Sequence, residues 1–378
     1  MSPSQGQRGS LLVREWPLLV SLGTAALFFA FGSSWSAYLA NPAWLAFLFV
    51  GLFAVMLLSA TAVVRHAESL AVKLGEPLGT LILTLSVTGI EVMMISSVMF
   101  TGEGHPALPR DAVFAAVMIV LNGMIGLSLL LGGLRYREQT YNLQAANAYL
   151  AVIVPLVVLS LVLPNFTVSA AGPKFSTLQA VFIIGISLAL YGVFLAIQNV
   201  RHREYFLEPA AVATTECPSA REPADPEVRS PAYHFPLLLV YLALITYLSR
   251  QIAVVIDYSI DVLKLPAALG GLFVSVLVLS SESLSAARAA LANQMQRSVN
   301  LLLGSVLATI SMTIPAVLTI GLIWGQTIHL GVDAVDMTLL VLTLGVSTLT
   351  FASGRTNVLL GAVHLLLFFA YLMLIFEK

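Results

Sequence analysis

The chain has 378 residues, of which 58% are hydrophobic and only 10% carry charge, whereas a soluble domain carries about 25% charge. The apolar stretches between charged residues repeatedly reach the ~20 residues that a helix needs to cross a bilayer. This composition predicts an all-α polytopic membrane protein and excludes a soluble enzyme or a transmembrane β-barrel. The net charge is −1 without a Lys/Arg-rich block, which argues against nucleic acid as a partner.

Charged residues and Pro/Gly clusters divide the chain into about eleven predicted transmembrane helices. They cover roughly 16–36, 42–64, 78–100, 112–134, 147–168, 176–199, 235–256, 267–287, 298–323, 330–352 and 356–376. The first run resembles a signal peptide, but further hydrophobic runs follow at once, so we read it as a retained helix. Alternating the sides of successive loops places thirteen Lys/Arg residues on one side and four on the other. The positive-inside rule then predicts a cytoplasmic N-terminus and a C-terminus on the opposite side.

The polar segment 200–233, which contains five prolines, is predicted to be a cytoplasmic linker between six helices and five. We therefore expect an N-terminal tail and first helix (1–41), a first five-helix repeat (42–199), this linker, and a second five-helix repeat (234–378). The second repeat starts from the opposite side of the membrane, so the two would be inverted. Inverted repeats are a common construction of secondary transporters, whose substrate site lies at the midplane between them.

Two carboxylates lie well inside predicted helices, where a charge costs at least ~2.5–3.5 kcal/mol. Glu91 and Glu282 each occupy the second helix of a repeat and are 191 residues apart, close to half the chain. This register favours a functional pair over two structural acids that hydrogen-bond to neighbouring helices. In the helix that follows each acid, Asn122 and Thr309 take corresponding positions.

Small polar side chains accompany both acids. Candidate site-lining residues are Asn122, Ser281, Thr88, Ser280, Ser86 and Thr309, with ordinary helix–helix hydrogen bonding as the alternative for each. Oxygen ligands of this kind suit hard cations such as Ca²⁺ and Na⁺. Glu76, just before the third helix, is a candidate cytoplasmic gate, against the alternative of a solvated charge beside Lys73. Burial raises the pKa of a carboxyl group and a bound cation lowers it, so proton and metal compete for the same oxygens.

Five segments resemble the bacterial inner-membrane calcium/sodium–proton antiporters, in the cation/proton exchanger branch of the calcium:cation antiporter superfamily. The segments are Val64–Ala67, Leu74–Gly79, Asn293–Arg297, Gly304–Ser311 and Ser353–Leu359. The resemblance implies that Glu91 and Glu282 are the cation- and proton-binding acids of two repeats, and that the protein lies in the bacterial inner membrane with a periplasmic C-terminus. It implies no cofactor, only the transported ions Ca²⁺, Na⁺, K⁺ and H⁺.

The chain departs from the antiporter pattern next to both acids. Val87-Thr88 and Val278-Leu279 replace the common Gly-Asn pair, and Ala308 stands where a glutamine is expected. Fewer side-chain oxygens remain for Ca²⁺, which makes Na⁺ or K⁺ exchange more plausible.

We therefore predict a secondary active transporter that exchanges cytoplasmic Ca²⁺, Na⁺ or K⁺ for external protons by alternating access. Its partners would be these ions and the lipid bilayer, and the sequence carries no signal of an oligomeric state. A passive cation channel is the alternative, although channels usually build a pore from a ring of chains. An intramembrane enzyme is a remote alternative, because no hydrolase motif is present.

Overall fold

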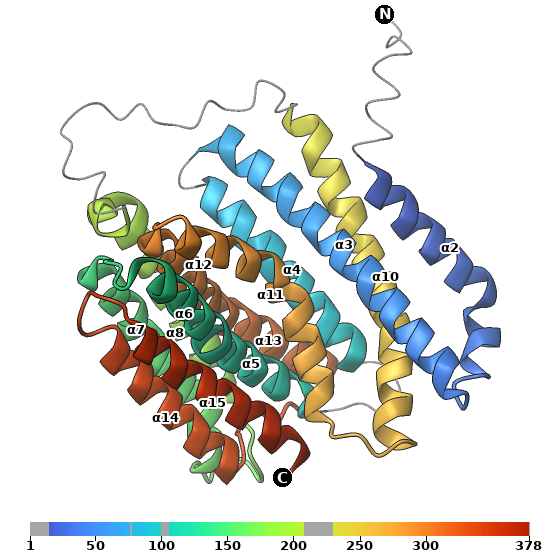
Figure 1. Ribbon diagram of the computed structural model, residues 1–378. Coiled ribbons are helices and arrows are strands. Elements are labelled where there is room, and N and C mark those ends of the chain that lie inside the picture. Colours follow the sequence, from blue (N-terminus) through green and yellow to red (C-terminus); the bar gives the residue numbers. More distant parts are fainter. Residues whose placement is uncertain (1–14, 76–77, 100–105, 208–229, 378) are drawn as a thin grey trace, which may run out of the picture. The chain divides into compact units, whose positions relative to one another are not determined.

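The computed structural model describes residues 15–75, 78–99, 106–207 and 230–377, and these residues are almost entirely helical (Figure 1). In chain order the helices are α2 (Trp16–Ser36), α3 (Pro42–Leu74), α4 (Leu78–Met99), α5 (Leu108–Met118), η1 (Ile119–Met124), α6 (Ile125–Tyr136), α7 (Leu143–Val157), η2 (Val158–Val162), η3 (Leu163–Asn165), α8 (Thr177–Ala196), η4 (Ile197–Arg201), η5 (Arg203–Phe206), α10 (Pro231–Asp261), α11 (Ala268–Leu291), α12 (Met295–Ala308), η6 (Thr309–Thr313), α13 (Ile314–Trp324), α14 (Ala334–Thr350) and α15 (Val358–Phe376).

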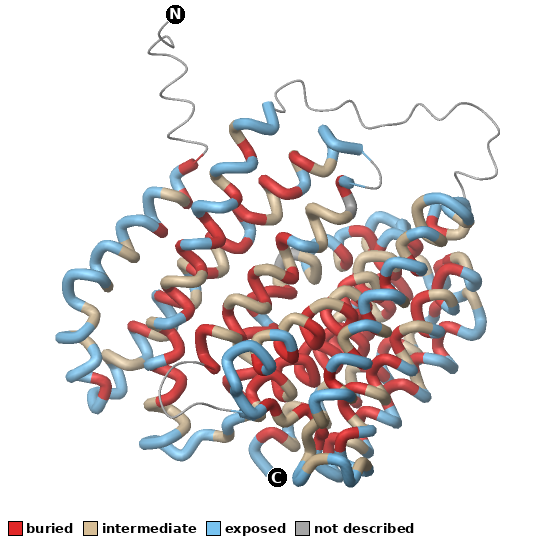
Figure 2. The backbone as a smooth tube through the Cα atoms, turned by 180° about the vertical axis from the view of Figure 1, so that it is seen from behind, coloured by how far each residue is buried: buried red, intermediate tan, exposed pale blue. Residues whose placement is uncertain are grey.

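Within the described ranges, nine helical stretches are long and apolar enough to cross a membrane. Two further segments fall outside this group: α11 bends by 53° between residues 280 and 282, and α14 is shorter than the others. The prediction of an all-α multi-pass membrane protein is confirmed, whereas the count of eleven membrane helices stays a prediction. The membrane helices differ strongly in how far they are buried (Figure 2). In the most apolar stretch of α2 only 11% of the residues are buried, whereas in that of the helix spanning residues 108–136, 83% are buried.

Several helices extend beyond the ranges expected from apolar runs. The second helix continues ten residues past its predicted end at Val64, to Leu74, because a helix keeps its hydrogen bonds where it leaves the hydrocarbon. Gly75 ends this helix with a φ of 68°, a conformation open to glycine. By contrast, α14 starts four residues later than predicted, where the Asp333 carboxylate caps it by accepting from the backbone N–H of Asp336 at 2.9 Å.

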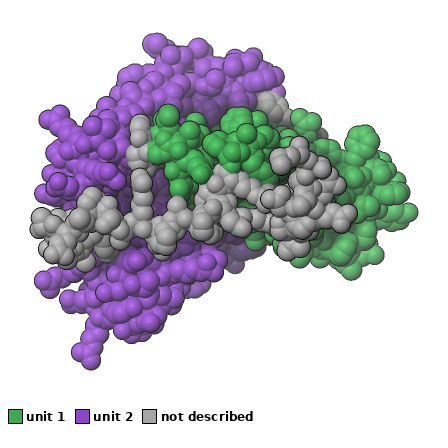
Figure 3. All heavy atoms as spheres, turned by 90° about the horizontal axis from the view of Figure 1, so that it is seen from above, with its two compact units in different colours: residues 1–104, 227–265 green, residues 105–226, 266–378 purple. Residues whose placement is uncertain are grey.

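The described chain forms two compact units, coloured separately in Figure 3. Unit 1 contains α2, α3, α4 and α10, and unit 2 contains all the other helices. Each unit therefore combines segments from both halves of the sequence. The predicted division into two inverted five-helix repeats describes the chain order rather than these units, and it stays a prediction.

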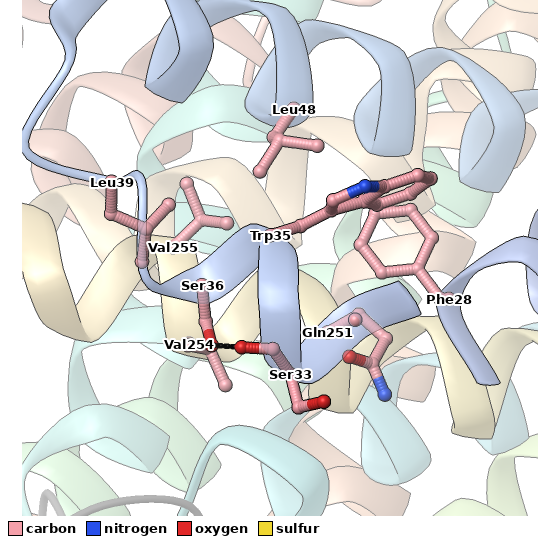
Figure 4. A pocket seen from close by; sticks show the side chains of 10 residues that line it. Phe28, Ser33, Trp35, Ser36, Leu39, Leu48, Gln251, Val254 and Val255 are labelled. Carbon is pink, nitrogen blue, oxygen red and sulfur yellow. Dashed lines mark hydrogen bonds between the residues drawn. The ribbon is translucent and has the colours of Figure 1, made fainter. Parts of the chain in front are cut away.

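In unit 1, α3 packs against α2, α4 and α10. The hydroxyls of Ser21 and Ser59 join α2 to α3 at 2.7 Å, and Ser97 of α4 donates to the carbonyl of Thr246 in α10 at 3.4 Å. A cavity of about 190 Å³ lies at the C-terminal end of α2 and is lined by residues of α2, α3 and α10, with Trp35 and Phe28 on one side (Figure 4). Its polar side chains are serines and Gln251, so it has no titratable lining group.

In unit 2, glycines permit two close helix contacts. A Cβ at Gly271 of α11 would lie 2.5 Å from the backbone of Asp111 in α5, and one at Gly361 of α15 would lie 2.6 Å from the backbone of Leu130 in α6. These contacts bring α5, α6, α11 and α15 together as the centre of the unit.

The predicted linker 200–233 lies partly outside the described residues, which leave out 208–229. Its first residues pack on unit 2: Phe206 is buried against Tyr149 and Phe194, and its carbonyl accepts from Asn300 at 2.7 Å. Helix α10 begins at Pro231, three residues before the predicted start of the second repeat. A proline suits this position because the first helical residue needs no backbone donor.

Candidate functional site

Glu91 lies in the second half of α4, in unit 1, and is only 3% exposed. Thr88, one turn earlier, and Ser86 are also buried. The Ser86 hydroxyl donates to the carbonyl of Ile82 at 2.7 Å, within its own helix. Such a bond leaves the hydroxyl oxygen available as an acceptor or cation ligand. The structure thus confirms that this acid is buried in a membrane helix.

Glu282 lies in α11 of unit 2 and is partly buried. The Ser305 hydroxyl of α12 donates a hydrogen bond to its Oε2 atom. Ser305 is itself buried and stands one helical turn before Thr309, which is buried too. The sequence prediction omitted Ser305, although its spacing of four residues from Thr309 places both on one helix face. The contact between Glu282 and Ser305 therefore joins α11 to α12, and Thr309 follows one helical turn after Ser305.

The two membrane helices that follow the acids are irregular near their middle, whereas the π turns η2 and η4 lie near the ends of their helices. Each is interrupted near its middle by a π-helical turn, η1 in residues 108–136 and η6 in residues 295–324. Asn122 lies in η1 and Thr309 opens η6. A π turn interrupts the regular backbone hydrogen-bond ladder and is frequent at functional sites. η1 contacts α11, which carries Glu282, and α12, which carries Ser305, whereas η6 directly continues α12 and contacts α5.

Asn122 is completely buried in a hydrogen-bonded network. Its amide Nδ2 donates to the Thr343 hydroxyl of α14 at 2.8 Å and contacts the Met118 sulfur at 3.4 Å. Its Oδ1 lies 3.3 Å from Nδ1 of His364 in α15, and the other ring nitrogen of His364 lies 2.9 Å from the Thr350 hydroxyl. The Asn122 side chain therefore links three helices of unit 2, in addition to any role toward a cation.

The remaining predicted site residues differ in what the structure describes. Ser280 donates to the carbonyl of Val276 in its own helix and is half-buried. The side chain of Ser281 and the whole of Glu76 lie outside the described residues. The predicted pairing of Glu91 with Glu282 involves both units and stays a prediction. Among the described residues, no group of three His, Cys, Asp or Glu side chains is arranged to hold a metal ion.

Two acids of unit 2 were not singled out from the sequence. Asp111 at the start of α5 and Asp336 at the start of α14 line a small cavity with Tyr371. Asp111 forms a 2.7 Å ion pair with Arg110. Their positions in first helical turns, next to loops, explain why they carry no signal of a buried charge in a hydropathy pattern.

The chain is a multi-pass helical membrane protein with one carboxylate inside a membrane-spanning helix and a second in the bent helix α11, and acids at such positions are typical of ion transporters. It belongs to the sodium/calcium exchanger protein family, which it matches over residues 44–200 and 233–377. The resemblance found in its sequence motifs is thereby confirmed.

Similar proteins include bacterial antiporters. The chain is 39% identical to the sodium-potassium/proton antiporter ChaA of Escherichia coli over 96% of both chains. It is 23% identical to the Ca²⁺/H⁺ antiporter of Aphanothece halophytica, over 79% of this chain and 81% of that one. Among solved structures, native YfkE is 17% identical and superimposes with a TM-score of 0.72, over 96% of this chain and 100% of that one. The H⁺/Ca²⁺ exchanger CAX gives a TM-score of 0.59 at 13% identity, over 98% and 89% of the two chains. These two likenesses show the fold.

Proposed function

We propose that this protein is a secondary active transporter that exports Na⁺, K⁺ or Ca²⁺ in exchange for protons by alternating access. The observation that carries the proposal is the presence of one carboxylate inside each of two membrane helices, Glu91 in α4 and Glu282 in α11, at matching places in the two halves of an exchanger-family chain. An intramembrane carboxylate is rare and usually marks an ion pathway or a proton relay.

Glu91 and Glu282 are proposed to bind cation and proton in turn. A carboxylate in a dry environment favours the protonated form, and an approaching cation favours the ionised form, so each ligand displaces the other. Near Glu282, the Ser305 hydroxyl supplies a further oxygen atom, and the π turn η1, which contacts α11, supplies irregular backbone. Such π turns are frequent at functional sites.

Among the three cations, we place Na⁺ and K⁺ ahead of Ca²⁺. Ca²⁺ sites typically contain about 6–8 oxygen ligands. Val87, Leu279 and Ala308, which lie near the acids in the sequence, have no side-chain oxygen, so few ligands remain for Ca²⁺. The 39% identity to an antiporter named for sodium, potassium and protons supports the same order. We also propose that the hydroxyl groups of Ser86, Thr88, Ser280 and Ser281 bind the cation as ligands additional to the two carboxylates.

The proposed location is the bacterial inner membrane, with the N-terminus in the cytoplasm and the C-terminus in the periplasm. The excess of Lys and Arg on the loops that share a side with the N-terminus supports this orientation. Glu76 is proposed as a gate residue at the cytoplasmic end of α4.

The test is coupled flux in proteoliposomes that carry an imposed pH gradient. Addition of Na⁺, K⁺ or Ca²⁺ is expected to dissipate the proton gradient, and the imposed gradient is expected to move the cation uphill against its own concentration. A passive channel, the competing function, moves a cation only down its electrochemical gradient. Cation movement that never proceeds uphill and is independent of the proton gradient would therefore contradict the proposal.

A further inference from the structure

A second buried polar cluster lies in unit 1 and contains two histidines. Nδ1 of His66 in α3 lies 2.9 Å from Nδ1 of His234 in the first turn of α10. Nε2 of His66 lies 3.4 Å from Oε2 of Glu15, which directly precedes α2. His66 is 1% exposed and His234 is 4% exposed. Three elements that are distant in sequence thus meet at a pair of imidazoles shielded from water.

The Glu15 carboxylate is held by several donors. Arg65 forms an ion pair with it at 2.7 Å, and the hydroxyls of Tyr233 and Tyr241 donate to it at 2.9 and 3.4 Å. The charges of Glu15 and Arg65 balance, so the cluster has no net charge while both histidines are neutral. Every added proton therefore leaves one uncompensated positive charge in a buried site.

The groups that face the histidines come from each neighbouring element. Glu15, Arg65 and His234 are the charged or titratable groups that act on His66. The ring centroids of Tyr233 and Tyr241 lie 6.2 Å and 5.7 Å from the ring centroid of His66. Helix α2 has no ionisable side chain, and α4 has Glu91 alone.

The geometry limits where the protons lie. Two nitrogens 2.9 Å apart share one proton, because a hydrogen bond has one donor and one acceptor. Nε2 of His66 lies 3.4 Å from the Glu15 carboxylate, which accepts, and 3.5 Å from Nη2 of Arg65, which donates. In either tautomer one Nδ1 of the pair carries the shared proton and the other is bare. A further proton fits without breaking this contact only on the Nε2 atom of the ring that donates the shared proton.

We propose that the His66–His234 pair is a proton-binding site, distinct from the transport carboxylates, which takes up one proton as the pH falls and so regulates transport. The regulatory step rests on the proposed function. A positive charge placed beside Arg65 weakens the packing of α3 against α10 and of both against the residue that precedes α2. An exchanger that carries protons into the cytoplasm acidifies it further, so inhibition of transport at low cytoplasmic pH would limit this acidification.

The proton site is tested without transport, by solid-state NMR of the ¹⁵N-histidine-labelled protein in lipid bilayers. We expect one bare and one protonated Nδ1 linked by a coupling through the hydrogen bond, and a joint change of both signals as the pH is lowered. Either His66→Gln or His234→Gln removes the coupling. His202→Gln, which changes a histidine stacked on Tyr205 in unit 2, leaves it intact. The absence of any coupling in the native protein, or independent titration of the two rings, would overturn the site.

Regulation is tested by the pH dependence of cation-driven proton flux, with the pH varied on the side that Glu15 borders. The native protein is expected to slow on acidification. His66→Gln, His234→Gln and the double variant are expected to lose the same part of this response, whereas His202→Gln keeps it. Profiles of the pair variants that coincide with the native profile would overturn the regulatory step. Failure of the proposed exchange would appear as absent flux at every pH, with the NMR result unaffected.

Discussion

The Glu282 carboxylate accepts a hydrogen bond from Ser305, and this contact is the most specific feature of the candidate site in unit 2. Replacing Ser305 by alanine removes a donor to a charged group, which is worth about 1.5–3 kcal/mol. If the hydroxyl helps to hold the cation-loaded carboxylate, Ser305→Ala raises the apparent KM for the cation about tenfold or more, because ~1.4 kcal/mol corresponds to a factor of ten. The measurement is the cation dependence of proton flux in proteoliposomes.

Ser298 provides the matched control for this prediction. It lies on the same helix, α12, and is fully buried, and its hydroxyl has no hydrogen-bond partner among the described residues. Ser298→Ala is expected to leave KM unchanged. An equal rise of KM in both variants would show that general packing of α12, rather than the contact with Glu282, governs cation affinity.

His329 lies between α13 and α14, outside the membrane spans, and its surroundings predict that the stability of the protein depends on pH. Burial, together with the positive charges of Lys174 and Arg110, holds the pKa of His329 below its usual value. The unfolded chain therefore binds more protons than the folded chain when the pH falls through the ordinary histidine range, and stability decreases with acidification. We expect the Tm to decrease between about pH 8 and about pH 5.5, the range in which histidine titrates, and to decrease less in His329→Gln than in the native protein. Equal losses would contradict this assignment.

At the scale of elements, the contact between α5 and α11 depends on Gly271. A Cβ at this position would meet the backbone of Asp111 and Ala112 at 2.5 and 2.6 Å, and backbone cannot move aside as a flexible side chain can. Gly271→Ala is therefore expected to destabilise the protein by about 1–3 kcal/mol, the usual cost of overpacking. The decrease is measured as a lower unfolding temperature in detergent.

Gly185 of α8 is the control for this packing prediction, since a Cβ there would meet no atom within 4 Å. Gly185→Ala is expected to leave the Tm unchanged or to raise it, because alanine favours a helix by up to about 1 kcal/mol over glycine. A Gly271→Ala protein as stable as the Gly185→Ala protein would contradict the close contact between α5 and α11.

The sequence predicted the membrane helices well because hydrocarbon imposes a length and a composition on them. Their ends were less predictable, since α3 continues past the charged residues Arg65 and Lys73, and α14 begins only after its N-cap residue Asp333. The π turns η1 and η6 have no signature in apolar content or spacing, so their position at Asn122 and Thr309 emerged only from the structure.

Residues of the candidate site were predictable to different degrees. Glu91 and Glu282 stood out because an acid in an apolar run is costly. The partners of Asn122 could not be found in the same way, because Thr343 and His364 lie more than two hundred residues away in ordinary-looking helices. The pair of His66 and His234 likewise brings together two single histidines from distant helices.

At the scale of the whole molecule, each compact unit contains one of the two candidate transport acids, Glu91 in unit 1 and Glu282 in unit 2. Each unit is also assembled from both halves of the sequence. The proposed exchange uses both carboxylates to bind cation and proton, so we expect each of them to be required for coupled transport.

The most direct test of this claim is simultaneous measurement of ²²Na⁺ efflux and proton uptake in proteoliposomes of the native protein, Glu91→Gln and Glu282→Gln. Glu138→Gln serves as the control, because Glu138 is an exposed acid whose side chain lies 3.7 Å from Arg355. We expect coupled fluxes in the native protein and in Glu138→Gln, and loss of coupled exchange in Glu91→Gln and in Glu282→Gln. Coupled sodium–proton exchange that persists in either Glu91→Gln or Glu282→Gln would contradict this claim.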